Sequence, residues 1–348
     1  MLTQTISSEV VVSPSRILQV GLGFWSSRVL LTAVHFKLFT IIPETGLTAE
    51  EIRASLGLQE RGLADFLDAL VALKFLYREG TESHARYYNT VEADSFLNRN
   101  RPTYMGGILE MANNRLYDSW GKMEEALKTG QPQNEIGENE RSAYDVLYTD
   151  KKKRAEFVHA MAGSQMGSFI SFARQFNCAG YRTHCDVGGS GGDLSIQLAL
   201  HHPEMRSVTF DLPEVTEIAR ENIDRHHLSE RVSAVAGDFF RDVLPRADMI
   251  TMAHVLHNWD LEKRMMLLQK AYDALPSGGV LVALENVIDD GRRENVFGLL
   301  MSLNMLINTK GGANFSFADF TGWIREAGFS RATVLHLSGS SSALIAHK

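Results

Sequence analysis

Residues 185–200, CDVGGSGGDLSIQLAL, join a short apolar segment to an apolar helical pattern through four glycines. Glycine lets a backbone approach a ligand closely, and a helix that begins after such a turn presents free N–H groups at its start. The stretch therefore predicts a strand, a ligand-binding turn and a helix. A nucleotide or phosphate loop is compatible with it, although the Gly-Lys-Ser/Thr ending of a Walker loop is absent.

Around this stretch, short apolar segments typical of strands alternate with helical patterns. Helical patterns run over 215–227 and 261–275. The predicted strands lie in the segments 183–189, 207–212, 231–238, 249–256 and 279–287. Such alternation favours a parallel sheet with helices on both faces, and ligands in such sheets bind at the carboxyl ends of the strands near the switch point.

Acidic residues end the first three predicted strands. Asp211 follows Asp186 by 25 residues, where a carboxylate can accept both hydroxyl protons of a ribose. Asp238 precedes Phe239, so an acceptor for an adenine amino group stands beside an aromatic surface. Each acid could also be a simple cap of a loop, but three at successive strand ends favour a nucleoside site.

The N-terminal part shows a different pattern. Residues 16–39 are apolar with helical spacing, Thr48 and Glu51 form a capping-box pattern, and 75–90 reads as two strands around a polar loop. Helix, turn, helix and hairpin together predict a winged-helix-like unit, which raises DNA binding as an alternative.

The predicted second helix of that unit, residues 61–73, argues against DNA binding. It carries Asp65 and Asp68 against Arg61, which would repel phosphate. We expect the unit to serve dimerisation instead.

Residues 100–176 read as helical and contain several methionines, which fill cores or line pockets for flat aromatic ligands. We therefore expect three parts: a winged-helix-like dimerisation domain at 1–98, a helical connector and substrate-pocket region at 99–176, and a sheet domain at 177–348.

The bulk properties exclude several classes of partner. A net charge of -7 and a pI of about 6.0 imply no general attraction to nucleic acid or anionic lipid. Cys178 and Cys185 cannot form a disulfide framework. With no signal peptide pattern and no run of about 18 apolar residues, we expect a cytoplasmic protein that does not span a membrane.

Two histidines in residues 253–260, AHVLHNWD, raise three hypotheses: a metal pair, a structural role or a proton acceptor. On a strand, His254 and His257 would point to opposite faces, so we expect no shared metal. His254 is expected to pack near a ligand, and His257 is the candidate base.

Several stretches together resemble one known family, the S-adenosylmethionine-dependent small-molecule O-methyltransferases of the plant caffeate/hydroxyindole type, in particular their bacterial natural-product branch. The resemblance covers nearly the whole chain. It rests on DVGGSGG (186–192), FDLPEV (210–215), GDFF (237–240), HVLHNWD (254–260), LENV (284–287) and FSFADFTGWIREAGF (315–329).

The resemblance implies an α/β, Rossmann-like class I methyltransferase domain behind an N-terminal winged-helix-like, mainly helical dimerisation domain. It implies S-adenosylmethionine (SAM) as the cofactor, a small aromatic substrate, a homodimer and no metal. Gly188 and Gly189 would hold the methionine part, Asp211 the ribose, and Asp238 with Phe239 the adenine.

By the same resemblance, His257 is the catalytic base and Glu285 orients it, while Met161 packs against the acceptor ring. The chemistry fits these residue types. A phenol with a pKa of about 10 is mostly neutral at pH 7, and an imidazole with a pKa of about 6.5 can accept its proton. A carboxylate on the other ring nitrogen fixes the tautomer.

Three positions depart from the family pattern. Asn314 stands where many relatives carry a second glutamate, Ala253 replaces a lysine, and Asn258 replaces an aspartate beside the base. Asn258 and Asn314 can still bind substrate through hydrogen bonds. The departures leave open C-methylation of an activated phenol ring, N-methylation of an aromatic amine, an inactive relative, and a winged-helix regulator that only senses SAM.

Overall fold

The computed structural model describes residues 12–81, 84–134 and 150–348, and its internal contacts separate two compact units, residues 1–113 and 114–348. The expected three-part division at 98 and 176 remains a prediction. Within the expected helical region, residues 135–149 lie outside the described part of the chain.

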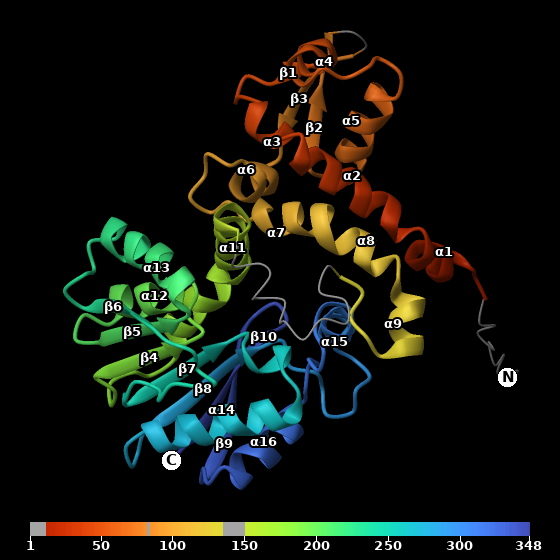
Figure 1. Cartoon of the computed structure of the whole chain (residues 1–348). Coiled ribbons are helices and arrows are strands. Elements are labelled where there is room, and N and C mark those ends of the chain that lie inside the picture. The colour runs from red at the N-terminus through yellow and green to blue at the C-terminus, as the bar shows by residue number, and fades with distance from the viewer. Residues whose placement is uncertain (1–11, 82–83, 135–149) are drawn as a thin grey trace, which may run out of the picture. The chain divides into compact units, whose positions relative to one another are not determined.

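The first unit is mainly helical with a small antiparallel sheet of order β1-β3-β2 (Figure 1). Its elements are α1 (Ser15–Gly21), α2 (Gly23–His35), α3 (Leu38–Ile41), β1 (Leu47–Thr48), α4 (Ala49–Leu56), α5 (Leu63–Ala72), β2 (Leu76–Glu79), β3 (Arg86–Asn89), α6 (Val91–Leu97) and α7 (Gly106–Met111). The predicted capping box is confirmed, because Thr48 Oγ1 accepts from the Glu51 backbone N–H and Glu51 accepts from that of Thr48. Helix α4 therefore begins where the sequence predicts.

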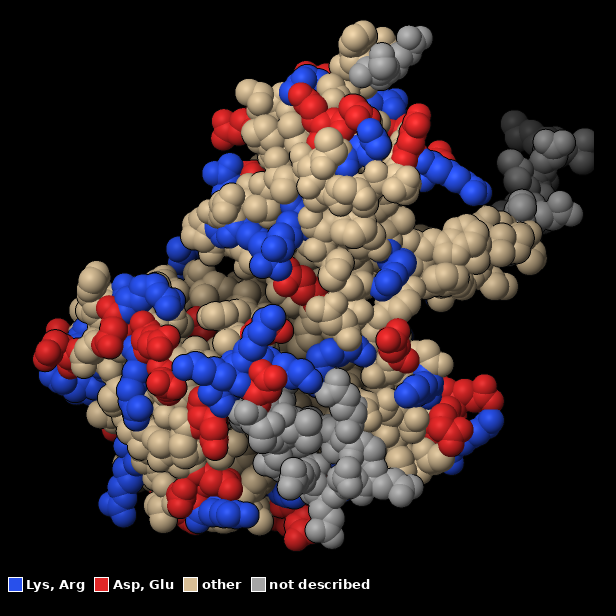
Figure 2. Space-filling view, turned by 45° about the horizontal axis from the view of Figure 1, so that its top comes forward, with Lys and Arg blue, Asp and Glu red and all other residues tan. Residues whose placement is uncertain are grey.

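The winged-helix pattern is confirmed as α4, α5 and the β2–β3 hairpin. Asp68 on α5 accepts from Arg78 of β2 at 2.6 Å and from the Tyr87 hydroxyl of β3 at 3.0 Å. Asp68, whose negative charge disfavours contact with phosphate, therefore connects α5 to the β2–β3 hairpin. On the face shown in Figure 2, acidic and basic side chains of this unit lie interspersed.

The second unit contains a seven-stranded sheet of order β6-β5-β4-β7-β8-β10-β9, parallel except for β10, which is antiparallel to both of its neighbours. Its strands are β4 (Thr183–Val187), β5 (Arg206–Asp211), β6 (Val232–Ala236), β7 (Met249–Ala253), β8 (Val280–Glu285), β9 (Arg331–Ser338) and β10 (Ser341–His347). The five predicted strands are confirmed. The C-terminal hairpin β9–β10 was not predicted.

Helices and short turns complete the second unit. They are α8 (Tyr117–Trp120), α9 (Met123–Thr129), α11 (Lys151–Gln175), α12 (Asp193–His201), α13 (Pro213–Arg225), η3 (Leu256–Asn258), α14 (Leu261–Ala274), α15 (Val296–Asn308) and α16 (Phe317–Glu326). A π-helical segment, η2 (Ala112–Leu116), precedes α8 along the chain.

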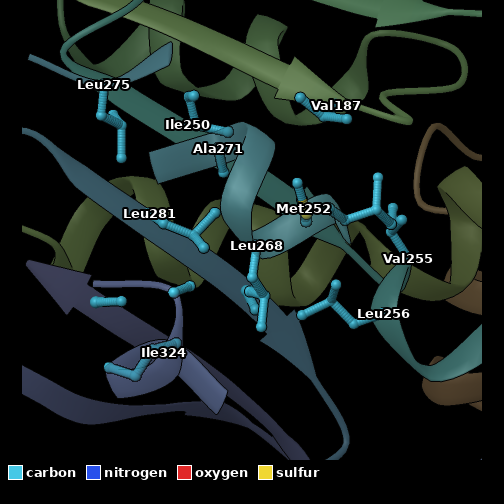
Figure 3. Packing of buried hydrophobic residues seen from close by; sticks show 14 of the residues in the cluster. Val187, Ile250, Met252, Val255, Leu256, Leu268, Ala271, Leu275, Leu281 and Ile324 are labelled. Atoms are coloured by element: carbon cyan, nitrogen blue, oxygen red, sulfur yellow. The ribbon is translucent and has the colours of Figure 1, made fainter. Parts of the chain in front are cut away.

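Hydrophobic cores on both faces of the sheet fix its position. Along β8, Leu281 and Ala283 belong to the cluster under α14 and α16, whereas Val280, Val282 and Leu284 belong to the cluster with α11 and α12. Successive strand residues point to opposite faces, so an uninterrupted apolar strand means that both faces are covered. Figure 3 shows the first cluster, in which α14 residues face side chains of β7 and β8.

The chain leaves β4 toward β5 on one side and later returns to its other side as β7. A reversal of strand order creates a crevice beyond the carboxyl ends of the strands. Here the crevice lies between the glycine-rich turn after β4 and the turn after β7.

Candidate active site

The first two positions of the glycine-rich turn after β4 have no room for side chains. Gly188 adopts a φ of +71°, and a Cβ on it would lie 2.8 Å from Val255 Cγ2 and 3.6 Å from the Phe239 ring. A Cβ on Gly189 would lie 2.2 Å from Thr209 Oγ1. Glycine is required at both positions, and the turn is a bare backbone cradle of the kind that a cofactor can approach closely.

A cavity lies over this cradle. Its wall comes from α11, from the turn after β4, from the start of α12 and from the end of β7, and includes Met161, Ala162, Gln165, Phe169, Asp186, Gly188, Gly189, Ser190, Asp193 and Ala253. Met161, predicted to contact the acceptor ring, therefore lies beside the predicted methionine-binding glycines. Apolar side chains of α11 and two carboxylates, Asp186 and Asp193, contribute to this lining.

Asp211 ends β5 next to the cradle and accepts hydrogen bonds from the backbone N–H groups of Ser190 at 2.8 Å and Leu212 at 2.7 Å. Burial raises the pKa of its carboxyl to about 6, although the two backbone bonds oppose that rise. The carboxylate is therefore held rigidly at the strand end, where the sequence predicted a ribose acceptor.

Asp238 and Phe239 follow β6. Asp238 accepts from the Phe240 backbone N–H at 2.8 Å and lies 3.4 Å from the Arg241 guanidinium. The Phe239 ring packs at right angles to Trp259, with centroids 6.1 Å apart. Since Phe239 also borders Gly188, the predicted adenine and methionine residues belong to one continuous region.

His257 and Glu285 form a buried pair. His257 lies on η3, and its Nδ1 is 2.5 Å from Glu285 Oε2 at the end of β8, while its backbone N–H donates to Oε1 at 3.3 Å. Burial opposes ionisation of Glu285, but attraction to the histidine and these hydrogen bonds hold the pKa of the carboxyl below its ordinary value. An ionised carboxylate only accepts, so Nδ1 carries the proton and Nε2 is left as the acceptor.

The structure corrects the expected placement of the two histidines. β7 ends at Ala253, His254 turns the chain with a φ of +54°, and His257 lies on a 3-10 turn, so strand alternation does not separate the rings. Their centroids are 5.6 Å apart, and His254 Nδ1 lies 3.9 Å from Glu285 Oε2.

The corrected placement also brings metal-ligating atoms together. The side chains of His254, His257 and Glu285 offer ligand atoms within 4.8 Å of one another, a donor set that can hold zinc. Burial lowers the pKa of His254 to about 4, so this imidazole is neutral at pH 7.

The two asparagines bond to backbone groups. Asn258 Nδ2 donates to the carbonyl of His254 at 2.8 Å, which supports the left-handed turn. Asn314 Nδ2 donates to the carbonyls of Asn286 at 2.9 Å and Gly298 at 3.1 Å. Its Oδ1 is buried and has no hydrogen-bond partner among the residues that the structure describes.

Sequence reasoning overlooked Arg264, which supports the turn that carries His257. This buried side chain donates to the carbonyls of Leu256 at 2.9 Å and Ala313 at 2.5 Å, and stacks over Phe315 and Trp323. An arginine four residues after the helix cap Asp260 is an ordinary surface pattern, so nothing in the sequence pointed to it.

Comparisons with known proteins identify the family. Models of an O-methyltransferase domain and an O-methyltransferase dimerisation domain match residues 120–330 and 18–99. The chain is 35% identical to the tetracenomycin polyketide synthesis 8-O-methyl transferase TcmO of Streptomyces glaucescens, over 96% of this chain and 97% of that protein.

Two further comparisons extend this likeness. The chain is 31% identical to the N,N-dimethyltransferase OxyT of Streptomyces rimosus, over 90% of each. It also resembles the crystal structure of human N-acetylserotonin methyltransferase in complex with SAM, with a TM-score of 0.89, 27% identity, and coverage of 98% of this chain and 99% of that one.

Proposed function

Because the chain belongs to the SAM-dependent O-methyltransferase family, we propose that it methylates a phenolic hydroxyl of a small aromatic metabolite of the polyketide type. The observation that carries this proposal is the buried pair of His257 and Glu285, in which His257 follows by two residues the Val255 side chain that borders Gly188. The 8-O-methyl transferase of tetracenomycin synthesis supports the class of acceptor.

His257 removes the phenolic proton in this proposal. The acceptor hydroxyl would give its proton to Nε2, which makes its oxygen a better nucleophile. Glu285 would stabilise the resulting imidazolium through Nδ1, at 2.5 Å. SAM, when bound, would supply the electrophilic methyl group. General-base catalysis of this kind contributes about 10² to 10⁴ in rate, and positioning contributes much of the rest.

The cofactor residues are assigned by the family resemblance. Gly188 and Gly189 would hold the methionine part, and neighbouring protein atoms leave no room for a Cβ at either position. Asp211, which ends β5, binds the ribose hydroxyls, and Asp238 with Phe239 binds the adenine.

Two of the three predicted substrate residues, Met161 and Asn314, are assigned to the substrate. Met161 lines the cavity and would pack against the acceptor ring. Asn314 offers a buried Oδ1 that can accept from an acceptor hydroxyl. Asn258 acts mainly by holding the His254 turn, because its amide already donates to two backbone carbonyls.

The reaction needs no metal. Methyl transfer from a sulfonium requires no Lewis acid, and a metal on His257 would compete with the proton that the base must take. Protein dialysed against EDTA is therefore expected to retain its full rate.

The dimerisation-domain match indicates a homodimer, and we assign its interface to the exposed apolar side chains of α1 and α2, including Ile17, Val20, Phe24 and Trp25. Within the described residues, 15–35 is the one stretch long and apolar enough to cross a membrane, by length and composition only. An apolar face in a dimerisation domain accounts for that composition. Two buried free thiols fit the cytoplasm.

The test is incubation with methyl-labelled SAM and a panel of hydroxylated naphthalenes and anthraquinones. Carbon-13 NMR of the product separates a methoxy group from an aryl methyl or N-methyl group. A methoxy product is expected, and it should decrease at least about 10²-fold in His257→Ala but not in His226→Ala, which changes a residue outside the site. Absence of transfer to any phenol contradicts the proposal.

N-methylation is the second candidate function, because one relative is an N,N-dimethyltransferase. An arylamine depends less on a base, so this candidate predicts an N-methyl product and a small effect of His257→Ala. A SAM-sensing regulator or an inactive relative would bind SAM without transferring its methyl group, and the regulator would also bind DNA tightly.

A further inference from the structure

The pair of His257 and Glu285 belongs to a closed set of contacts that joins three separate segments of the chain. The segments are the turn before α14, the end of β8 and the loop before α16. We call this set the contact ring. It is made by the side chains of His257, Glu285, Asn314 and Arg264 and by the peptide bonds beside them. Its first contact joins His257 Nδ1 to Glu285 Oε2 at 2.5 Å.

Arg264 of α14 joins the turn to the loop. Its Nε donates to the carbonyl of Leu256 at 2.9 Å, and its Nη2 donates to the carbonyl of Ala313 at 2.5 Å. Leu256 directly precedes His257, and Ala313 directly precedes Asn314. Because the guanidinium is planar and rigid, it fixes the separation of the two carbonyls to which it donates. The base and Asn314 are thus each attached to a residue that Arg264 holds.

Asn314 joins the loop to the end of β8. Its Nδ2 donates to the carbonyl of Asn286 at 2.9 Å, and Asn286 directly follows Glu285. The same nitrogen donates to the carbonyl of Gly298 at 3.1 Å, so both amide protons are used and the orientation of the amide is fixed. A glutamate carboxylate only accepts and could not make these two bonds. Since Glu285 is the partner of His257, this contact closes the contact ring.

The Arg264 side chain is itself firmly held. It is 5% exposed, and its guanidinium lies over the rings of Phe315 and Trp323, 5.2 Å from each centroid. Burial lowers the pKa of the guanidinium from its ordinary value, while attraction to nearby carboxylates, Glu285 first among them, opposes that change. A buried cation that stacks on two aromatic rings has little freedom to move. The two carbonyls that it binds are restrained with it.

The loop also packs directly against the turn that carries the base. A Cβ on Gly312 would lie 2.6 Å from the carbonyl oxygen of His257 and 2.9 Å from that of Asn258. The loop backbone therefore approaches the turn more closely than any side chain would allow. This packing is independent of the guanidinium, so two separate contacts hold the loop against the turn.

We propose that Arg264 and Asn314 are positioning residues, which close the contact ring and so fix the direction of His257 Nε2. The proposal rests on the proposed function, in which Nε2 takes the proton of the acceptor. The imidazole is held from one side by its own backbone and from the other by Glu285, and the contact ring fixes both. A misplacement of about 1 Å can cost on the order of 10²-fold in rate. Opening the contact ring therefore slows transfer without weakening the binding of SAM.

The experiment compares Arg264→Lys, Asn314→Ala and the double variant of the full chain. Transfer of labelled methyl to the best phenol of the panel gives kcat and the acceptor KM, and calorimetry gives the Kd for SAM. Lysine keeps the charge but not the planar fork that spans two carbonyls. Each single variant should lower kcat on the order of tenfold at an unchanged Kd. The loss of Oδ1 in Asn314→Ala should appear separately, as a higher acceptor KM.

The double variant distinguishes the contact ring from two unrelated structural roles. One broken contact already opens the contact ring, so the double variant should be no slower than the slower single variant. Independent roles would instead multiply, to a loss on the order of 10²-fold.

Arg231→Lys is the matched control. Arg231 also donates to backbone carbonyls, including those of Ala199 at 2.7 Å and Pro203 at 3.1 Å, but it directly precedes β6, at the amino end of that strand. Its replacement should lower the unfolding temperature without changing kcat.

A parent kcat in Arg264→Lys, or multiplied losses in the double variant, overturns the proposal. Should Arg264→Lys fail to fold, Asn314→Ala decides, and a parent kcat in that variant overturns the proposal. Absence of transfer by the unchanged protein contradicts the proposed function, and the positioning role falls with it. An unchanged kcat in the variants contradicts the positioning role alone.

Discussion

At the scale of single residues, the site depends on one carboxylate that is ionised despite complete burial. Glu285 receives a side-chain and a backbone hydrogen bond from His257. Among the described residues no second acid bonds to this histidine, and Asn314 bonds instead to backbone carbonyls. A buried charge is tolerated only with such partners. The chemistry of the site is therefore concentrated in one pair.

Glu285→Gln tests whether catalysis depends on the pair of His257 and Glu285. Glutamine keeps the size but not the charge, so the imidazolium loses its partner, and kcat should fall on the order of 10²-fold. Steady-state rates check this, with thermal unfolding to confirm the fold. An unchanged rate would remove Glu285 from the mechanism.

The ionisation of Glu285 also gives stability a pH dependence of definite sign. Folding lowers its pKa from a value of 4.5, so the pair stabilises the folded state above that pH and loses this contribution as the pH falls through the folded value. Asp186 acts in the opposite sense in the free protein. Its raised pKa of about 7 makes the fold less stable as the pH rises toward neutrality.

At the scale of elements, the turn between β4 and α12 decides whether a cofactor can approach the sheet. Two of its glycines face atoms that would collide with any side chain, whereas Gly322 within α16 has no neighbouring atom in the way. A glycine in a turn and a glycine in a helix therefore have different roles, although both occur in motifs of the same family.

Gly189→Ala should disrupt this turn. Its Cβ would lie 2.2 Å from Thr209 Oγ1 and 2.8 Å from Asp186 Oδ2, both in the interior, so the backbone must shift. Overpacking of this kind costs about 1–3 kcal/mol of stability, and calorimetry should show SAM binding at least about tenfold weaker. Gly322→Ala is the control and should bind SAM normally. Equal SAM binding by Gly189→Ala and Gly322→Ala would contradict the proposal that the turn after β4 holds the cofactor.

At the scale of the whole molecule, the exposed apolar face of the N-terminal helices α1 and α2 requires a partner surface that shields it from water. Ile17 and Val20 are each 76% exposed, Phe24 is 54% exposed and Trp25 is 60% exposed. Isolated apolar residues on a surface are ordinary, but a continuous helical face of them marks an interface. In a chain with a dimerisation-domain match, a second copy is the fitting partner.

The double variant Phe24→Ser/Trp25→Ser should shift the protein from dimer to monomer at micromolar concentration, because two aromatic anchors of the interface are lost. Size-exclusion chromatography with light scattering measures the mass. Val91→Ser is the control, since Val91 is 87% exposed on α6, away from this helical face. A double variant that remains fully dimeric would place the interface elsewhere.

The sequence by itself determined the order of the elements and the residue types of the site. Strands such as β8 are readable because both of their faces are apolar, and the capping box at Thr48 is readable because its bonds are local in the chain. Glu285 could be named because it closes a predicted strand in a recognisable motif. Local patterns and strand ends carry this information without tertiary contacts.

The tertiary structure decided what depends on distant segments meeting. β7 ends at Ala253, so His254 and His257 approach the same carboxylate, contrary to the expectation from strand alternation. The C-terminal hairpin joins the sheet only through pairing with β8. The contacts of Arg264 and the hydrogen bond from Thr251 to Asp186 form only because separate elements converge. Such contacts follow from packing, and packing joins residues that no local pattern connects.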